Sequence, residues 1–445
     1  MSRMNSALLR RSTALIGLVA ASLALASCGG GSKKPPLPGE RIAVLKSTTV
    51  LEADAALAEA TVELPRPETY ADWPQAGAFP DHARHHLALG DQVTQAWTAS
   101  IGTGSARRRA LQSLPVVADG KVFTVDSEGY VSAHAIGDGR LLWRAPTIPD
   151  DEDDPTVSGA AAFAGGKLYV ATAAAELVAL DAADGKELWR KPLPAPVRAA
   201  PTISGDRIFI ITLDNQTIAL SLDDGKRLWG HSGISEVAGL LGGGAPAVSG
   251  DYVVVPYSSG ELFALRYENG RLLWADNLSG LRQSNAVAGL ANIRGNPVID
   301  RGVVFAASHA GRLGAIELRT GERIWDRELS VQEDPWVAGE YLFVVTTNGE
   351  VVALTRTDGR MRWVRPLQRF ADEKNQKEPI RWSGPVLAGD RLLLTSSEGK
   401  IAAVSPYTGE LLGEMGIPGA AVLPPIVVGK TLYVLTEDGR LAAYR

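Results

Sequence analysis

The chain has 445 residues, of which 45% are hydrophobic and 47 are glycine, and it carries a formal net charge of −5. A chain of this size and composition can bury a large core, and its acidic balance excludes the basic footprint of a nucleic-acid-binding protein. Its single cysteine, Cys28, excludes an intramolecular disulfide and a cysteine-based metal cluster.

The first 27 residues are predicted to be a lipoprotein signal peptide. Three arginines precede an apolar run over residues 14–26, which is too short to span a membrane. The run ends in Leu25-Ala26-Ser27-Cys28, which resembles the bacterial lipobox, whose cysteine is lipidated and becomes the new N-terminus. Cleavage would remove three arginines and no acid, so the net charge would change from −5 to −8. An ordinary signal peptide with an unrelated cysteine is the alternative.

Residues 28–69 are interpreted as the lipidated cysteine and a periplasmic tether. Within them, residues 29–40 combine glycine, lysine and proline, a composition typical of a flexible and then extended linker. Gly29 follows the cysteine, which is similar to lipoproteins that are sorted to the outer membrane.

Three histidines, His82, His85 and His86, lie in the segment that leads into the rest of the chain. They could bind a metal, but no cysteine or carboxylate stands at a fixed spacing to orient a site. Surface or hydrogen-bonded histidines are therefore the favoured interpretation, and the sequence predicts no metal site.

A repeat organises the remainder. In residues 205–229 a β-branched run, a polar turn, an alternating run and an Asp-Gly turn lead to Trp229. Such runs predict strands joined by tight hairpins. Seven copies share the register, with Gly in place of Trp at position 413, and an eighth stops at the C-terminus. We expect the strand 92–98 to supply the last strand of that eighth copy.

This period predicts an all-β fold, an eight-bladed β-propeller of four-stranded antiparallel blades over residues 70–445. The recurring tryptophans are predicted to pack between neighbouring blades, beside the small Ala and Gly of the repeat. These residues are Trp97, Trp143, Trp189, Trp229, Trp274, Trp325 and Trp363.

The connections between blades vary in length and are expected to emerge on one face, where function usually resides. Two of them, residues 233–244 and 280–295, are long, glycine-containing and fairly apolar. Leu240 and Leu241 in the first could contact a partner or fold back onto the blades. We found no catalytic motif in a suitable context, and this does not exclude a site assembled from several blades.

The complete repeat Ala179-Leu-Asp-Ala-Ala-Asp-Gly-Lys-Glu-Leu-Trp189 resembles the tryptophan-docking motif of pyrroloquinoline quinone (PQQ)-type propellers. One branch of that superfamily is the quinoprotein dehydrogenases, whose entry segment is similar to residues 72–75, but whose adjacent cysteine pair this chain cannot supply. The lipobox, tether and eight blades instead resemble the BamB family of outer membrane protein assembly factors.

This resemblance implies a non-catalytic scaffold without cofactor or metal, lipid-anchored through Cys28 on the periplasmic face of the outer membrane. The implied partners are the BamA periplasmic domains, other components of the barrel-assembly machinery and nascent outer-membrane proteins, with no nucleic acid. The family's partner-binding positions fall on Leu240, Leu241, Asn292 and Arg294 of this sequence, of which only Leu240 keeps the family's residue type. A PQQ-dependent periplasmic dehydrogenase and a ligand-binding propeller remain the alternatives.

Overall fold

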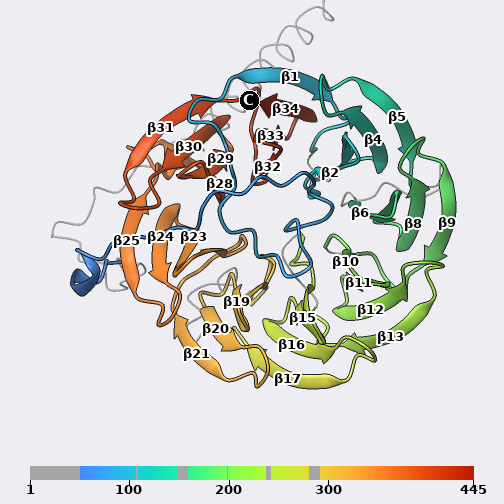
Figure 1. Cartoon of the computed structure of the whole chain (residues 1–445), viewed down its shortest axis with the longest axis horizontal. Helices are drawn as coiled ribbons and strands as arrows, with labels where there is room; N and C mark the ends of the chain where they lie inside the picture. The colour runs from blue at the N-terminus through green and yellow to red at the C-terminus, as the bar shows by residue number, and fades with distance from the viewer. Residues whose placement is uncertain (1–50, 107–108, 149–158, 198, 237–241, 280–290) are drawn as a thin grey trace, which may run out of the picture. The chain divides into compact units, whose positions relative to one another are not determined.

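Each repeat folds into one four-stranded antiparallel sheet. The computed structural model describes residues 51–106, 109–148, 159–197, 199–236, 242–279 and 291–445, all within the unit Val50–Arg445. In this part of the chain eight such sheets surround a central axis as the blades of a propeller (Figure 1). The predicted all-β, eight-bladed fold is confirmed.

Within blades 1 to 7, the strands follow chain order from the axis to the rim. Blades 1 to 4 are β2 (Val116–Ala118), β3 (Lys121–Val125), β4 (Tyr130–Ala135), β5 (Leu141–Pro146); β6 (Ala160–Ala164), β7 (Lys167–Ala171), β8 (Glu176–Asp181), β9 (Glu187–Pro192); β10 (Thr202–Ser204), β11 (Arg207–Ile211), β12 (Gln216–Ser221), β13 (Arg227–Ser232); and β14 (Ala247–Ser249), β15 (Tyr252–Pro256), β16 (Glu261–Arg266), β17 (Leu272–Asn277). Blades 5 to 7 are β18 (Val298–Asp300), β19 (Val303–Ala307), β20 (Leu313–Glu317), β21 (Arg323–Arg327); β22 (Trp336–Ala338), β23 (Tyr341–Val345), β24 (Glu350–Thr355), β25 (Met361–Pro366); and β28 (Trp382–Ala388), β29 (Arg391–Ser396), β30 (Lys400–Val404), β31 (Leu411–Gly416).

The eighth blade is built from both ends of the propeller. Strands β32 (Ile426–Val428), β33 (Thr431–Leu435) and β34 (Arg440–Tyr444) are completed by β1 (Gln95–Ser100), which pairs antiparallel with β34. The closing strand therefore lies two or three residues later than the range 92–98 read from the sequence. Because it pairs with the last strand, the ring has no open seam of unpaired backbone groups.

The repeat tryptophans lie between blades. Each faces the repeat alanine on the neighbouring strand of its own blade, as Trp143 faces Ala133. Each also packs on the repeat glycine of the next blade, where an added Cβ would lie only 2.4–2.9 Å from the indole or, at Gly225, equally close to a lysine stem. Those glycines have φ between 64° and 77°, which the hairpin requires and which favours glycine.

Six indole N–H groups also donate to a backbone carbonyl three residues before that glycine, at 2.6–3.3 Å. Trp189 is different, since its Nε1 is buried and has no hydrogen-bond partner among the described residues. The carbonyl that corresponds to its position, that of Leu222, accepts instead from the Tyr169 hydroxyl at 3.0 Å.

Residues 68–89, which we call the axial segment, run across the inner strands of the ring (Figure 1, blue trace near the centre). Its two ends lie side by side, because Glu68 pairs with Leu87. In between, the segment contacts every blade in ring order, from blade 8 through blades 1 to 7. The contacts are Tyr70 with Gly429, Trp73 with Val117, Pro74 with Phe163, Gln75 with Ile203, Pro80 with Val248, Asp81 with Ile299, His85 with Trp336, and Leu87 with Leu387.

These contacts satisfy the inner edges of the blades. The backbone N–H groups of five inner strands donate to the axial segment at 2.7–2.9 Å; they belong to Val117, Phe163, Ile203, Val248 and Ile299. Without these acceptors, five donors would face the axis unpaired.

The part of the expected tether that the structure describes is held against blade 6. A 3-10 turn, Ala55–Leu57, is capped by Asp54 and lies beside β25 (Figure 1). Asp54 accepts from Arg360 at 2.7 Å and donates its N–H to Met361 at 2.8 Å. Arg362 donates to the Ala60 carbonyl at 3.0 Å.

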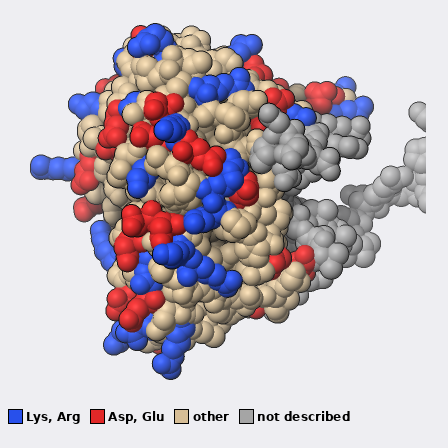
Figure 2. All heavy atoms as spheres, turned by 90° about the vertical axis from the view of Figure 1, so that its right-hand side faces the viewer, with Lys and Arg blue, Asp and Glu red and all other residues tan. Residues whose placement is uncertain are grey.

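A small hairpin, β26 (Phe370–Asp372) and β27 (Lys377–Pro379), is inserted between blades 6 and 7. Over the side of the molecule seen in Figure 2, positive and negative side chains are interspersed. No helix in the described residues has the length and apolar character needed to cross a bilayer.

Candidate docking face

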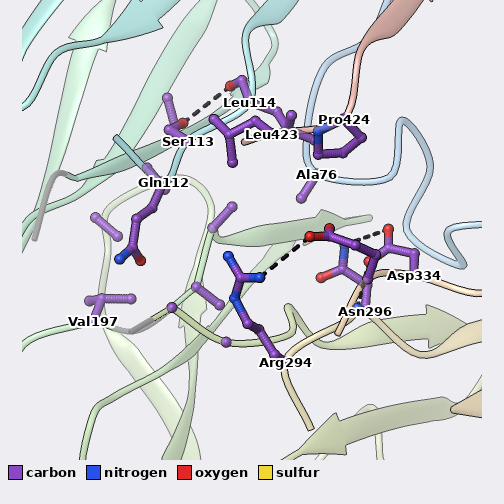
Figure 3. A pocket seen from close by; sticks show the side chains of 18 of the residues that line it. Ala76, Gln112, Ser113, Leu114, Val197, Arg294, Asn296, Asp334, Leu423 and Pro424 are labelled. Carbon is purple, nitrogen blue, oxygen red and sulfur yellow. Dashed lines mark hydrogen bonds and ion pairs between the residues drawn. The ribbon is translucent and has the colours of Figure 1, made fainter. Parts of the chain in front are cut away.

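The connections between blades meet around a funnel at one end of the axis. A cavity of about 110 Å³ is lined by residues from the connections that precede six different blades, among them Leu114, Gly242, Arg294 and Asp334. Ala76 of the axial segment also lines it, so the segment contributes to its wall (Figure 3). The face that the variable connections were expected to share is therefore a real, concave surface.

A second and wider cavity, of about 500 Å³, adjoins the first and shares Arg294, Gln332 and Glu333 with it. Its wall includes the apolar side chains of Leu111, Ile380 and Trp382 together with these charged groups. Ile380 and Trp382 follow directly on the β26–β27 hairpin.

Charged groups in the funnel connect the loops of different blades. Arg294 and Glu333 form an ion pair at 3.4 Å, and Ser383 donates to the same carboxylate oxygen at 3.3 Å. Burial raises the pKa of Glu333 above its usual value, although Arg294 acts in the opposite direction. These three residues come from the connections or strands of blades 5, 6 and 7.

Asp334 is held more firmly. Asn296 donates to it through its backbone N–H at 2.7 Å and through its side-chain amide at 3.0 Å, and Arg84 of the axial segment pairs with it at 2.9 Å. The Arg84 guanidinium also stacks on Trp336, 4.4 Å from the ring centroid. The arrangement fixes the positions of the loops, and it offers a preorganised surface around Arg294.

The sequence-predicted partner residues fall on this face to different degrees. Leu240 and Leu241 lie outside the described residues, but Gly242 and Gly243, which follow them, line the same cavity as Arg294. A Cβ on Gly244 would lie 2.5 Å from the Gly295 carbonyl, so the two connections run in close contact.

Asn292 is fully buried, and its carbonyl accepts from the His309 N–H at 3.0 Å. It therefore holds the loop, whereas Arg294, with 27% of its side chain exposed, reaches the cavity.

The three histidines do not converge. His82 Nδ1 lies 2.7 Å from the Pro297 carbonyl, His86 Nδ1 lies 2.8 Å from the Pro65 carbonyl, and His85 Nε2 lies 3.6 Å from Asp300. The contacts of His82 and His85 lie at opposite ends of β18, and that of His86 lies ahead of the axial segment. Within the described ranges, no group of three or more His, Cys, Asp or Glu side chains is arranged to hold a metal ion.

Sequence reasoning did not identify Arg84, Glu333 or Asp334. None lies in a recognisable motif, and they meet only because the axial segment crosses beneath the blade connections. Asn296 carried the one usable signal, since an Asn-Pro pair at the start of an inner strand predicts a loop fixed by side-chain hydrogen bonds.

Comparison with protein families gives a match to the model of the family Outer membrane protein assembly factor BamB over residues 127–365 and 369–445, more than half of the chain. The chain belongs to the BamB family. BamB of Escherichia coli strain K12 is 27% identical over 353 residues, which cover 78% of this chain and 87% of that protein. BamB of Salmonella typhimurium LT2 is 27% identical over 357 residues, 79% of this chain and 88% of its own length.

Among solved structures, BamB from Moraxella catarrhalis superimposes with a TM-score of 0.66 at 20% identity, covering 80% of this chain and all of that one. Quinohemoprotein alcohol dehydrogenase from Comamonas testosteroni gives a TM-score of 0.64 at 15% identity, covering 84% of this chain and 80% of its own. Both show the fold alone. The BamB family match begins at residue 127, so the axial segment lies before the matched region.

Proposed function

We propose that this chain is a non-catalytic scaffold of the β-barrel assembly machinery, which assists the folding and insertion of outer-membrane β-barrel proteins. The observation that carries the proposal is the BamB family match, which spans blades 2 to 7, the two outer strands of blade 1 and three of the four strands of blade 8. The relatives of E. coli and Salmonella are named as outer membrane protein assembly factors, and they align over more than three quarters of this chain.

The funnel face is the proposed docking surface for the BamA periplasmic domains. In support, the connection that carries Leu240 and Leu241 runs against the one that carries Arg294, and both contribute to one cavity. Arg294 is the contact group in this proposal, and Asn292 maintains the loop from its buried position. Other components of the machinery and nascent outer-membrane proteins are the further partners.

Cys28 is the proposed lipidation site, and residues 1–27 are the proposed signal peptide. The acylated protein would lie on the periplasmic face of the outer membrane, with residues 28–69 as the lipidated cysteine and tether, of which residues 54–61 are held on blade 6. Replacing Cys28 with Ser should move the protein from the membrane pellet to the soluble periplasmic fraction. A Cys28→Ser protein that stays with the outer membrane would argue against lipid anchoring.

The decisive experiment is recovery of partners from solubilised membranes with the full-length tagged protein. We expect the core component of the barrel-assembly machinery in the eluate, and a deletion strain should show lowered levels of outer-membrane barrel proteins. Dye-linked oxidation of alcohols or sugars after addition of PQQ and Ca²⁺ should stay at background. Turnover in that assay, or normal barrel-protein levels together with an empty eluate, would refute the scaffold proposal.

A further inference from the structure

One aliphatic side chain on the funnel side of the propeller is held out toward solvent. Ile234, in the connection between β13 and β14, is 60% exposed, the highest value among the exposed large hydrophobic residues that the structure describes. Most of the others lie on outer strands at the rim, such as Leu228 of β13 at 45%. Ile234 shares its connection with Leu240 and Leu241 but not the described cavity.

The backbone of Ile234 is fixed on both sides by side chains. Its N–H donates to Glu261 at 2.8 Å, and its carbonyl accepts from the Asn215 side-chain amide at 2.6 Å. Asn215 is fully buried, and its own Oδ1 accepts from the N–H and the hydroxyl of Ser258. Turns of blades 3 and 4 thus clamp the residue between them.

Gly233, the residue before Ile234, is packed closely against the propeller. A Cβ on Gly233 would lie 2.3 Å from the ring of the buried Tyr257, so the chain passes directly over that ring. Both backbone groups of Ile234 are engaged and the preceding residue is seated on a buried ring, so the loop holds the Ile234 side chain at its 60% exposure. Leaving an aliphatic group in water in a fixed position costs free energy that a partner surface would recover.

The surroundings of Ile234 are apolar and acidic. Leu213, 44% exposed, stands two residues before Asn215 in the same turn. The three segments that form the clamp, residues 212–216, 231–236 and 258–261, contain Asp214, Glu236 and Glu261 and neither lysine nor arginine. A protein surface that complements them would carry positive charge around an apolar pocket.

We propose that Ile234, with Leu213 in the adjoining turn, is the apolar anchor of a docking surface for a folded protein domain that presents an apolar pocket edged with Lys or Arg. A central aliphatic group within a polar rim is the usual composition of an interface hot spot. This inference rests on the proposed function, since the domain would belong to the periplasmic part of the core barrel-assembly component.

The test measures binding of the purified full-length protein to the purified periplasmic domains of that component. Ile234→Ala should weaken binding about tenfold, and Glu236→Gln should weaken it mainly at low salt, where the acidic rim attracts a basic partner. Leu228→Ala is the matched control. Leu228 is also an exposed aliphatic residue, but it lies at the rim, on the strand β13 that precedes the connection carrying Ile234. This variant should bind as the wild type does, and all variants should unfold at the wild-type temperature.

The outcomes separate the two proposals. If the wild type binds and Ile234→Ala binds equally well, the anchor is wrong and the proposed function stands. If the wild type does not bind at all, the proposed function fails and this inference fails with it. Self-association of the wild type that Ile234→Ala abolishes would also overturn the inference, because the occupant would then be a second copy of this chain.

Discussion

His82 illustrates how a single residue is matched to its position in the axial segment. It has a positive φ of 63°, it is 1% exposed, and its Nδ1 donates to the Pro297 carbonyl at 2.7 Å, as a neutral ring allows. Burial lowers its pKa to about 4, because a charged imidazolium would lose its hydration there. The ring is therefore a structural hydrogen-bond donor at neutral pH.

Acid should destabilise the propeller through this residue. Between pH 6.5 and pH 4 the unfolded chain binds a proton at His82 that the folded chain does not, so stability falls as pH decreases across that window. A pKa that falls from 6.5 to about 4 corresponds to a loss of about 3 kcal/mol in the free energy of unfolding. Urea denaturation at a series of pH values should show a smaller acid loss in His82→Asn than in the wild type, since asparagine tolerates positive φ and does not titrate.

His85→Asn is the control for this measurement. His85 lies three residues away and also has a positive φ, of 50°, but its side chain is 33% exposed. This variant shows how much of any change comes from replacing a histidine by asparagine at a positive-φ position of this segment. An unchanged profile in His82→Asn would show that the acid loss originates elsewhere.

At the scale of the elements, the contact between blades is an indole seated on a glycine hairpin. The seventh blade lacks the indole, since Gly413 stands in its place and faces Ala403. The structure explains this exception. In the eighth blade the outer strand β1 comes from the N-terminal side of the propeller, so no Asp-Gly hairpin joins it to β34, and no glycine is there to receive a ring.

The hydrogen bonds of the indoles give a paired prediction. Trp325→Phe removes the bond to the Arg356 carbonyl, 2.8 Å long and buried, and should lower the free energy of unfolding by about 1–2 kcal/mol more than Trp189→Phe does. Trp189 loses ring area but no hydrogen bond to the described residues. Equilibrium urea unfolding of both variants measures the difference, and an equal or larger loss in Trp189→Phe would contradict the argument.

At the scale of the whole molecule, the sequence predicts the ring well and its axis poorly. Strand number, hairpins and the tryptophan register follow from a local period that every copy repeats, so Trp97 could be placed from spacing alone. The axial segment has no period. Its contacts join residues up to 359 positions apart, as Tyr70 and Gly429 show. The backbone of Ala78 has a positive φ, and an alanine gives no sequence signal for that conformation.

The same reasoning applies to the docking face. The position of the connections could be inferred from blade topology, because all chain-length variation falls between blades. Which side chains meet there could not, since Arg84 reaches Asp334 across 250 residues. The exposure of Ile234 could not be predicted from the sequence either, because it depends on the hydrogen bonds that Asn215 and Glu261 make to its backbone.

Removal of the axial segment should weaken the entire ring. A chain that begins at Asp91 keeps β1 but leaves the five inner-strand N–H groups without acceptors and removes Trp73 and Leu87 from the largest hydrophobic cluster. We expect a loss of roughly 5 kcal/mol or more, at about 1 kcal/mol for each hydrogen bond. A chain that begins at Ser105 also lacks the closing strand and should not form a stable monomer. Differential scanning calorimetry measures the melting temperatures, and sedimentation measures whether each shortened chain is a monomer. Melting of both shortened chains at the temperature of the full-length protein would contradict the prediction.

The attachment of residues 54–61 to blade 6 determines how the molecule bears mechanical load. Any pull that arrives along the chain from residue 50 first meets the ion pair of Asp54 with Arg360 and the bond from Arg362 to Ala60. It then meets the many contacts of the axial segment, and reaches the strand β1 last. If Cys28 is lipidated as proposed, tension from the membrane would break these peripheral contacts before it could open the closed ring.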